Sequence, residues 1–498
     1  MNILCFKEGS KLLPEDLKNQ IASKTQMDVP DILKKLELAH VLKHRLPKMD
    51  VGEINLEEEI EKFEDKEYYS FKYVGILMIN DLFLIIYPKY IRDVKKDFYG
   101  DKHKLLQIMQ VIDKYQSVYT YDTDSEENLG SFLALQIKII REYFNAGLYS
   151  TDEVIMELNG EGPTSWEQTI NENIAYLVDD IPFYFDIFTQ KKILNEMDII
   201  RRIHASILTE ISRNLAPILS IFGLKSVILN EEDKNDFGSN NYLEYLIDQE
   251  LSRQFITSKQ VILNDLKRYI WSKEEHANDD IEMYGTSSFN LVWEDICKTV
   301  YRDNLNDSLK NLTKKGLKIE GKNKEGEYLK YNKNRKSRNG EVTQNKLKNI
   351  VDRPIWTDEI SYLSTEVNKT LELDVLHVDF ETKQFEIYDG KYYTIEFISS
   401  ISDQCSRPTI RVTGQPGVSD VTKQYLYQLA YKNLAEINDF RFTNTFIVPK
   451  DEFKKVRDII ATVKMEMFSA MGLEDIKVVA RDCETFYNEY LAKDGITK

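Results

Sequence analysis

The sequence contains few cysteines and no long apolar run. Its four cysteines, Cys5, Cys297, Cys405 and Cys483, lie far apart among 498 residues. This spacing argues against a disulfide scaffold or a paired-cysteine zinc site and favours a reducing compartment. The longest apolar run, Leu82 to Tyr87, is far shorter than the roughly 20 residues that span a bilayer. Because the first residues also lack a basic and apolar targeting segment, we expect a cytoplasmic protein without membrane contact.

The sequence also lacks the motifs of several enzyme classes. Six histidines, of which only His40 and His44 stand close together, leave little for a histidine-based metal site. Residues 316–323 nearly match a phosphate-binding loop, but they end in Asn where the loop needs a Ser or Thr hydroxyl for magnesium. The residues before them are charged, whereas such a loop follows a buried strand. We therefore expect that this chain binds no nucleotide itself.

Positive charge is scarce over most of the chain. Lys and Arg number 66 against 83 Asp and Glu, and the net charge is −17. This balance argues against a uniformly basic nucleic-acid-binding protein. Residues 310–348 are the exception, because they hold thirteen Lys or Arg and four Glu, a local charge of +9. Four glycines and few apolar residues occur there, so we predict a mobile cationic insertion.

The length predicts two to four domains of about 150 residues each. The N-terminal half combines a predicted hairpin, with strands at 68–78 and 82–87, with helical spacing from residue 104 and a helix over 131–147. Residues 186–275 have mainly helical patterns, and His204 on their apolar face is interpreted as a core histidine.

The C-terminal region has an α/β pattern. We predict strands at 371–378 and 385–388, continued at 392–396, then a helix at 419–434, a short strand at 446–448 and a final helix at 452–471.

One group of charged residues in this region points to chemistry. Asp374 lies in a predicted strand, and Asp389-Gly390-Lys391 ends the next one. Strand side chains alternate between faces, so Asp389 and Lys391 project to the same side, where a neighbouring strand can place Asp374. Two carboxylates can hold Mg²⁺ through oxygen ligands, and a lysine can polarise a scissile phosphate or the attacking water. The alternative is an ordinary turn of an unrelated enzyme, with the three side chains more than about 10 Å apart.

The spacing Asp374…Asp389-Gly390-Lys391 resembles the PD-(D/E)XK nuclease motif, with Leu373 at the position of the motif's proline. Longer stretches resemble the LlaJI restriction endonuclease family, which is related to McrC, the nuclease subunit of McrBC-type restriction systems. These stretches are 73–75 to 87–89, 166–170, 289–294, 389–393, 416–428 and 444–449.

The resemblance implies a C-terminal PD-(D/E)XK fold, a mixed sheet flanked by helices, in a multidomain α/β and α+β chain. It divides the chain into a motor-binding region at 1–165, a helical connector at 166–275 and an endonuclease domain at 276–498 with the basic insertion at about 310–348. The implied partners are double-stranded DNA and an McrB-like AAA+ GTPase, which the chain binds and stimulates. The rival interpretation is a non-catalytic regulatory or DNA-binding subunit with a degenerate nuclease-like domain.

The resemblance also assigns roles to residues. Asp374, Asp389, Glu294 and the Gly390 carbonyl are the expected ligands of Mg²⁺, or of Mn²⁺ in its place, and Lys391 is the polarising cation. Supporting or DNA-binding roles are expected for seven further side chains: Lys423, Gln424, Gln428, Lys333, Arg335, Lys336 and Arg338. The last four lie in the basic insertion, which is either a DNA-backbone contact or a solvated loop.

Overall fold

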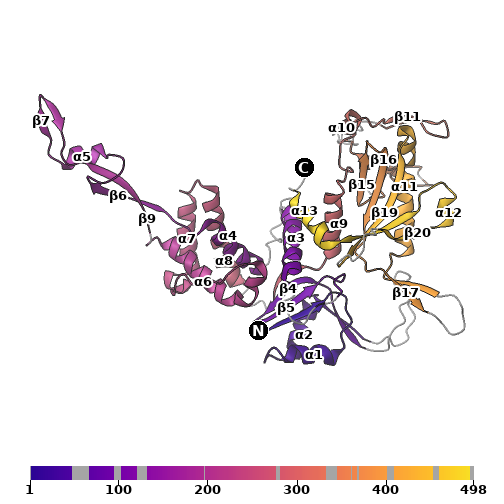
Figure 1. Cartoon of the computed structure of the whole chain (residues 1–498), viewed down its shortest axis with the longest axis horizontal. Helices are drawn as coiled ribbons and strands as arrows, with labels where there is room; N and C mark the ends of the chain where they lie inside the picture. The colour runs from indigo at the N-terminus through magenta and orange to yellow at the C-terminus, as the bar shows by residue number, and fades with distance from the viewer. Residues whose placement is uncertain are drawn as a thin grey trace. The chain divides into compact units, whose positions relative to one another are not determined.

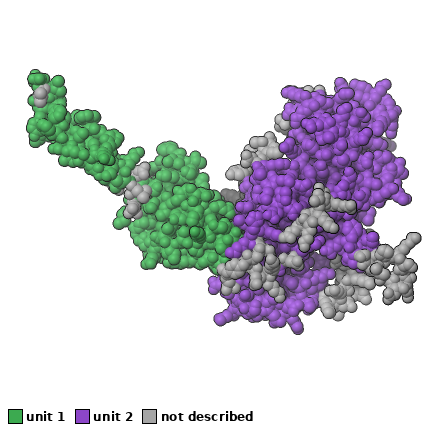
Figure 2. All heavy atoms as spheres, in the orientation of Figure 1, with its two compact units in different colours: residues 1, 129–284 green, residues 2–128, 285–498 purple. Residues whose placement is uncertain are grey.

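The computed structural model describes residues 2–46, 67–92, 94, 102–120, 132–195, 197–275, 281–331, 345–360, 362–366, 370–400, 409–451 and 459–493. It contains two compact units, one of residues 129–284 and one of residues 2–128 with 285–498, coloured green and purple in Figure 2. Both units mix helices with strands, which confirms the predicted multidomain α/β class. The functional division at residues 165 and 275 stays a prediction. None of the described helices is long and apolar enough to cross a membrane.

The unit of residues 129–284 has a helical body and an arm. The body contains α4 (Phe132–Ala146), α6 (Ile199–Leu219), η3 (Ser220–Phe222), η4 (Lys234–Phe237), α7 (Asn240–Leu251) and α8 (Thr257–Glu275). The arm projects from this body (Figure 1) and is built on an antiparallel strand pair. Its elements are β6 (Asp152–Leu158), α5 (Trp166–Glu172), β7 (Tyr176–Val178), β8 (Ile181–Phe183) and β9 (Phe188–Leu194).

The body confirms two predictions and corrects a third. The predicted helix is α4, and Gly147 follows it with a φ of 79° that favours glycine. His204 is buried, and its Nδ1 accepts a hydrogen bond of 3.1 Å from the Tyr149 N–H. The helical interpretation of residues 188–194 is wrong, because this segment pairs along its whole length with β6. The paired residues of β6 lie 30 to 42 positions upstream, too far away for a local sequence pattern to reveal them.

In the other unit, the N-terminal segment supplies β1, β5 and β4 of a small sheet of order β1-β5-β4-β10. Its described residues also contain three helices and an antiparallel pair of β2 with β3. The predicted hairpin is confirmed, with β4 and β5 joined at Asn80, whose φ is 50°. All six residues of β5 are buried, which accounts for its apolar run. The elements are β1 (Ile3–Lys7), α1 (Pro14–Ala22), α2 (Val29–Leu38), β2 (Leu42–Arg45), β3 (Tyr68–Phe71), β4 (Val74–Ile79), β5 (Leu82–Tyr87), α3 (Lys102–Thr120) and β10 (Glu282–Thr286).

The C-terminal region is built on a five-stranded mixed sheet of order β15-β16-β19-β21-β20. The three central strands are parallel and both edge strands are antiparallel to their neighbours. The strands are β15 (Val375–Asp379), β16 (Gln384–Gly390), β19 (Arg441–Lys450), β20 (Ile459–Val463) and β21 (Ile476–Asp482).

Helices pack against this sheet (Figure 1). On the side of α11 (Val418–Asn438), Tyr425 packs with Phe446, and Tyr431 packs with Phe385. α9 (Phe289–Val300) approaches at Gly390, and α13 (Cys483–Ala492) packs against α9, with Trp293 and Phe486 rings 5.4 Å apart. The packed helices therefore bury the core of the sheet, and this core fixes the positions of the ends of β15 and β16.

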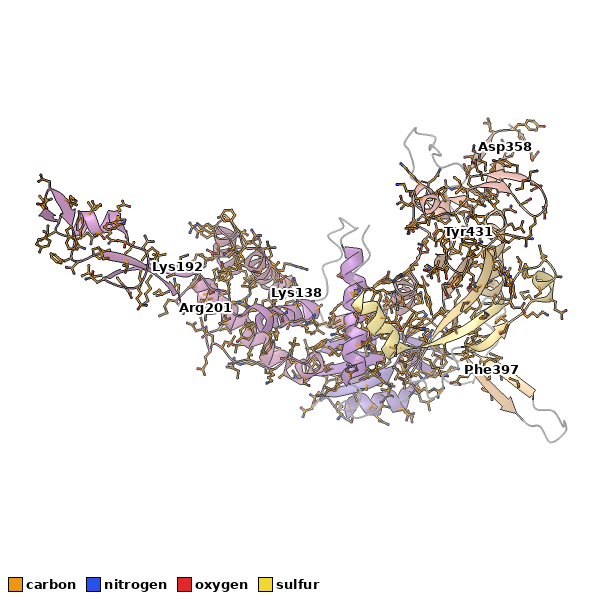
Figure 3. The ribbon with its side chains drawn as sticks, turned by 45° about the horizontal axis from the view of Figure 1, so that its top comes forward. Lys138, Lys192, Arg201, Asp358, Phe397 and Tyr431 are labelled. Carbon is orange, nitrogen blue, oxygen red and sulfur yellow. The ribbon has the colours of Figure 1, made fainter. Side chains whose placement is uncertain are left out.

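Three short hairpins and three small helices complete the region. The hairpins are β11 (Glu320–Lys322) with β12 (Tyr328–Lys330), β13 (Ile355–Thr357) with β14 (Ser364–Glu366), and β17 (Glu396–Ser400) with β18 (Thr409–Thr413). Figure 3 shows Phe397, a half-exposed residue of β17, on the hairpin that leaves the sheet. The helices are α10 (Leu309–Lys314), η6 (Leu347–Ile350) and α12 (Glu466–Ser469).

Three predictions for this region are wrong. The first part of the basic insertion is folded: Leu312, Leu317 and Ile319 are buried in the core that also contains Tyr431. The predicted final helix at 452–471 instead contains β20, because this strand completes the sheet beside β21; residues 452–458 lie outside the described residues. The predicted continuation of the strand at 392–396 is also wrong, since residues 391–395 form an irregular segment.

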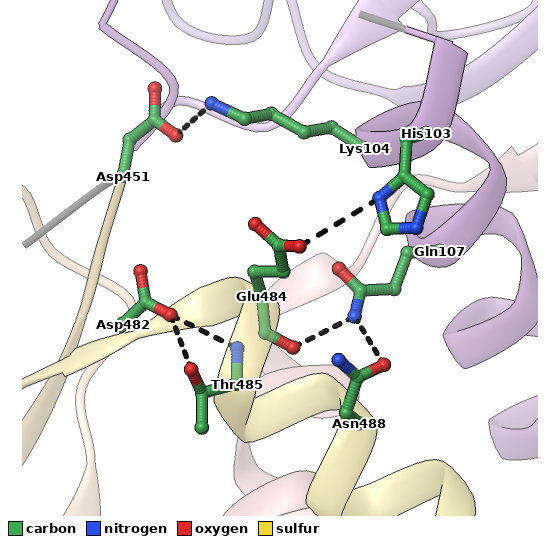
Figure 4. A network of polar contacts seen from close by, with 8 residues as sticks. All are labelled: His103, Lys104, Gln107, Asp451, Asp482, Glu484, Thr485 and Asn488. Carbon is green, nitrogen blue, oxygen red and sulfur yellow. Dashed lines mark hydrogen bonds and ion pairs between the residues drawn. The ribbon is translucent and has the colours of Figure 1, made fainter.

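The N-terminal segment is joined to the C-terminal region by a dense polar contact between α3 and α13 (Figure 4). Lys104 Nζ lies 2.6 Å from Asp451 Oδ1, at the end of β19. Gln107 donates hydrogen bonds to the Glu484 carbonyl at 2.8 Å and to Asn488 Oδ1 at 2.9 Å. Since Gln107 is buried, these bonds satisfy a polar group that would otherwise be costly to bury. The described part of the N-terminal segment thus belongs to the architecture around the C-terminal sheet.

The packing of the insertion predicts a stability effect. Replacing the fully buried Leu312 with alanine leaves a cavity in the core, and it should lower the free energy of unfolding by about 2–5 kcal/mol. The same replacement at Leu363, which is 72% exposed, should change it by less than about 0.5 kcal/mol. Urea denaturation followed by tryptophan fluorescence measures both. Equal, small effects at the two positions would show that the start of the insertion is not part of the core.

Candidate active site

The register of β15 and β16 brings two acidic residues together. Val375 pairs with Tyr388 at the end of the ladder. Asp374, which directly precedes β15, therefore lies opposite Asp389, one position further along. An oxygen of Asp374 accepts a hydrogen bond of 3.2 Å from the Gly390 N–H. Asp374 was predicted inside the strand and instead lies at its start, where its side chain can turn toward the end of β16.

Asp389 is a buried carboxylate with 5% exposure. Burial, followed by a hydrogen bond with Asp374 and the charge of that residue, raises the pKa of Asp389 to about 8. Lys391 acts in the opposite direction, since its ammonium lies 3.2 Å from Asp389 Oδ2. Two carboxyl groups that share a hydrogen bond at a buried position require a proton or a cation between them.

Lys391 is held between two carboxylates. Its Nζ lies 3.2 Å from Asp389 and 3.1 Å from Asp420, in the first turn of α11. Burial favours the neutral amine, but the charges of these carboxylates outweigh it and raise the pKa of Lys391 above its usual value. The predicted shared face of Asp389 and Lys391 is confirmed. Asp420 was not among the predicted residues, although an acidic residue in the first turn of the next helix was a usable signal.

Gly390 permits the close approach of α9. A Cβ atom at this position would lie 3.1 Å from Cys297 Sγ and 3.3 Å from Glu294 Cα. The helix is anchored there by Trp293, whose Nε1–H donates a 3.1 Å hydrogen bond to the Ile447 carbonyl. Burial and the charge of Asp374 raise the pKa of Glu294. The Glu294 carboxyl is therefore near enough to Asp374 for their negative charges to repel, while its role at the site stays a prediction.

The predicted polar residues of α11 divide into two environments. Lys423 is exposed, whereas Gln424 and Gln428 are buried against β19. The Asn444 amide donates to the Gln428 oxygen at 3.4 Å and to the Gln424 carbonyl at 3.3 Å. Burial removes Gln424 and Gln428 from any DNA-facing surface, so only a supporting role remains a prediction for them.

Tyr427 is a further neighbour that sequence reasoning missed. Burial, together with the charges of Asp389 and Asp374, raises the pKa of Tyr427 to about 12. Tyr427 is far from Asp374 and Asp389 in the sequence, and tyrosine is common in helices. No sequence signal therefore indicated Tyr427. Of the basic insertion, Lys333, Arg335, Lys336 and Arg338 lie outside the described residues.

The donor set fits a magnesium site in part. Asp374 and Asp389 supply the hard oxygen ligands that Mg²⁺ prefers, and their shared hydrogen bond marks a position that a cation would stabilise. Among the residues that the structure describes, no three His, Cys, Asp or Glu side chains lie close enough together to hold a metal ion. The ligand roles of Glu294 and the Gly390 carbonyl therefore stay predictions. The separation expected for an ordinary turn is absent, because Asp374, Asp389 and Lys391 meet.

Comparison with solved structures gives only distant likeness. A chain from a half-complex of the tetradecameric assembly of Thermococcus gammatolerans McrB AAA+ hexamers with bound McrC is 13% identical, covers 98% of both chains and has a TM-score of 0.35. A chain of the McrBC complex of the same organism is 13% identical, with 61% of this chain and 88% of that chain covered and a TM-score of 0.23. These scores are too low to support a structural argument.

Sequence comparison is more informative. A curated relative, the type II restriction enzyme BsuMI component YdjA of Bacillus subtilis strain 168, is 24% identical over 441 residues, which cover 84% of this chain and 80% of the relative. The sequence model of the LlaJI restriction endonuclease family matches residues 73–327 and 339–483. These ranges include Glu294, Asp374, Asp389 and Lys391. The match covers most of the chain and confirms the resemblance: the chain belongs to the LlaJI restriction endonuclease family.

Proposed function

We propose that the chain is a Mg²⁺-dependent endodeoxyribonuclease subunit of a restriction system that acts in defence against phage. The observation that carries this proposal is the meeting of Asp374, Asp389 and Lys391 at the ends of two adjacent strands. Membership of a restriction endonuclease family supports the reaction class. The substrate is then double-stranded DNA and the bond cleaved is a phosphodiester.

A PD-(D/E)XK architecture is part of this proposal. It is supported by a mixed five-stranded sheet with helices packed against it and by the motif at the ends of its first two strands. Leu373 stands where the motif has proline, and it is buried next to Asp374. A buried apolar residue can fix the start of β15 as proline would, so this departure removes no reactive group.

The residues divide the chemistry among themselves. A bound Mg²⁺ would supply a Lewis acid and lower the pKa of a bound water, and Asp374 and Asp389 are the residues that would hold it, with Glu294 beside them. Lys391 presents an ammonium next to Asp389, where it can stabilise the negative charge that develops on the phosphate. Asp420 restrains that ammonium from its other side, at 3.1 Å. Such fixed charges need no reorganisation during the reaction.

A partner motor is the second part of the proposal. The arm of residues 152–194 carries many exposed apolar side chains, which is unusual for a surface without a partner. They include Leu158, Trp166, Ile170, Leu177, Ile181 and Phe185. Together with the family's resemblance to McrC, this surface supports docking of an McrB-like AAA+ GTPase that the chain stimulates, with the docking region extended from residues 1–165 into the predicted connector. Mn²⁺ is expected to replace Mg²⁺, and the chain itself binds no nucleotide in this scheme.

The rival function is a subunit that binds DNA or regulates without cutting. It is favoured by the absence of a third metal-ligating side chain near the acidic pair within the described part of the chain. Measurements of metal binding and of DNA cleavage distinguish this rival function from the proposed nuclease function.

Replacing Asp389 with Asn, or Lys391 with Ala, should abolish cleavage of duplex DNA by the full chain assayed with its partner subunits and Mg²⁺, because each change removes a charge at the reacting centre. Calorimetry with Mn²⁺ should show binding to the wild type and none to the Asp374→Ala variant. Exposed Asp81, replaced with Asn, is the matched control and should leave both properties unchanged. Cleavage at the wild-type rate by the Asp389 or Lys391 variants would sink the catalytic assignment. Equal Mn²⁺ binding by wild type and Asp374→Ala would favour the rival.

The raised pKa of Asp389 predicts a pH-dependent stability in the absence of metal. A carboxyl whose pKa is about 8 when folded, against an ordinary 3.8, favours folding while protonated; this contribution is complete below about pH 4 and is lost as the pH rises through about 8. Asp389→Asn removes the loss, so its melting temperature relative to wild type should rise across this interval in EDTA. Melting curves at several pH values measure it, with Asp81→Asn as control. A difference that stays constant with pH would contradict the buried, protonated state.

The basic surface at the start of the insertion should contact the DNA backbone. Lys310, Lys314, Lys315 and Lys318 are exposed there, and their joint replacement with Gln preserves the buried Leu312 and Ile319. Each lost phosphate contact should reduce the slope of log K against log salt by about 0.9. A control with Lys18, Lys24, Lys34 and Lys43 replaced, all exposed on the N-terminal segment, should keep the wild-type slope. Identical slopes for the two variants would mean that this surface is only solvated.

A further inference from the structure

A cluster of three residues joins the N-terminal sheet to the segment that follows Lys391. The Tyr392 hydroxyl donates a 2.6 Å hydrogen bond to Glu8 Oε2 and accepts one of 3.1 Å from the Lys89 N–H. The Lys89 N–H also lies 3.3 Å from Glu8 Oε2, and the Lys89 ammonium stands 4.4 Å from the centroid of the Tyr392 ring. Glu8 follows β1 and Lys89 follows β5, two paired strands, so the cluster ties the edge of one sheet to the end of another.

Tyr392 at the centre of the cluster is buried, while Glu8 and Lys89 are each partly exposed. Tyr392 is 5% exposed, and its ring packs against Phe289 at 5.2 Å and Tyr90 at 6.4 Å between ring centroids. Burial raises the pKa of Glu8, and the Tyr392 hydroxyl and the Lys89 charge oppose that rise. Two hydrogen bonds to partners of fixed position restrict the buried Tyr392 hydroxyl to one location. They therefore also restrict the backbone of Tyr392.

That backbone carries Lys391. β16 ends at Gly390, so Lys391 is outside the ladder with β15, and its N–H is held by the Ile447 carbonyl at 2.9 Å. The next backbone contact is the 2.9 Å bond from the Tyr393 N–H to the Lys391 carbonyl, which closes a tight turn around Tyr392. The side chain of Tyr392 therefore holds this turn in place, and the hydrogen bond to Glu8 holds the Tyr392 side chain.

We propose that Tyr392, held by Glu8 and the Lys89 N–H, is a positioning residue for Lys391, an inference that rests on the nuclease function proposed above. Loss of the hydroxyl frees the turn and lets the lysine ammonium move away from its place between Asp389 and Asp420. A displacement of about 1 Å at a reacting group can cost about a hundredfold in rate. The N-terminal sheet then contributes to catalysis, although its residues do not touch the reacting atoms.

The test uses the full chain with its partner subunits, Mg²⁺ and a duplex DNA substrate. Tyr392→Phe keeps the ring packing and removes only the hydroxyl, and it should lower the single-turnover rate at saturating DNA about ten- to hundredfold. Glu8→Ala should lower it to a similar extent, whereas Glu8→Gln, whose amide oxygen still accepts from Tyr392, should retain most of the rate. The dissociation constant for DNA should stay at its wild-type value in all three. Tyr328→Phe, at an exposed tyrosine of β12, is the matched control.

Four outcomes would overturn the inference. Wild-type turnover by Tyr392→Phe, while Lys391→Ala is inactive, contradicts the positioning role and leaves the nuclease function standing. A loss that appears only in DNA affinity, or a fall of Glu8→Gln equal to that of Glu8→Ala, also contradicts it. Absence of cleavage by the wild type overturns the nuclease function and the inference together. Thermal melting checks that Tyr392→Phe is folded at the assay temperature; the double variant Tyr392→Phe with Glu8→Ala should lose no more rate than either alone, because both act through one contact.

Discussion

The structure of the site depends on the placement of two carboxylates side by side, of which Asp389 is buried and Asp374 is half-buried. Such a pair is unfavourable unless a proton or cations neutralise it. The chain meets this demand with the Lys391 ammonium at 3.2 Å from Asp389 and with the Gly390 N–H at 3.2 Å from Asp374. The remaining negative charge, with Glu294 nearby, is what makes the pair a candidate site for a divalent cation.

Several features of the fold follow from keeping this pair in place. Gly390 lacks a side chain because α9 passes within van der Waals contact of it, and Trp293 anchors that helix to β19. The first turn of α11 supplies Asp420 to Lys391 from the other direction. After Lys391, Tyr392 joins the segment that follows β16 to the N-terminal sheet, and α3 is bound to α13 by buried polar contacts. Residues from the whole length of this unit thus surround one short segment, Asp389 to Tyr392.

The sequence predicts those contacts of the site whose two residues are close together in the chain. Alternation along β16 was enough to place Asp389 and Lys391 on one face, because it is a local property. The pairing of Asp374 with Asp389 followed from a hairpin-sized separation. Asp420, 29 residues from Lys391, is signalled only by its place in the first turn of the next helix. Glu8 is 384 residues from Tyr392, and a single sequence contains no signal for a contact of that range. The same limit explains β9, whose strand partner is distant, and the cationic stretch, whose few apolar residues, Leu312, Leu317 and Ile319, are packed in a core.

The central claim is that Asp374 and Asp389 form a divalent-metal site. The most direct measurement is a crystal structure of the full chain grown with Mn²⁺, with diffraction recorded where manganese scatters anomalously. If the two residues bind the metal, an anomalous peak should lie roughly 2 Å from a carboxylate oxygen of each residue, a separation typical of a small hard cation. A well-ordered site with no peak there, and with the Asp389 carboxyl still hydrogen-bonded to Asp374, would contradict it.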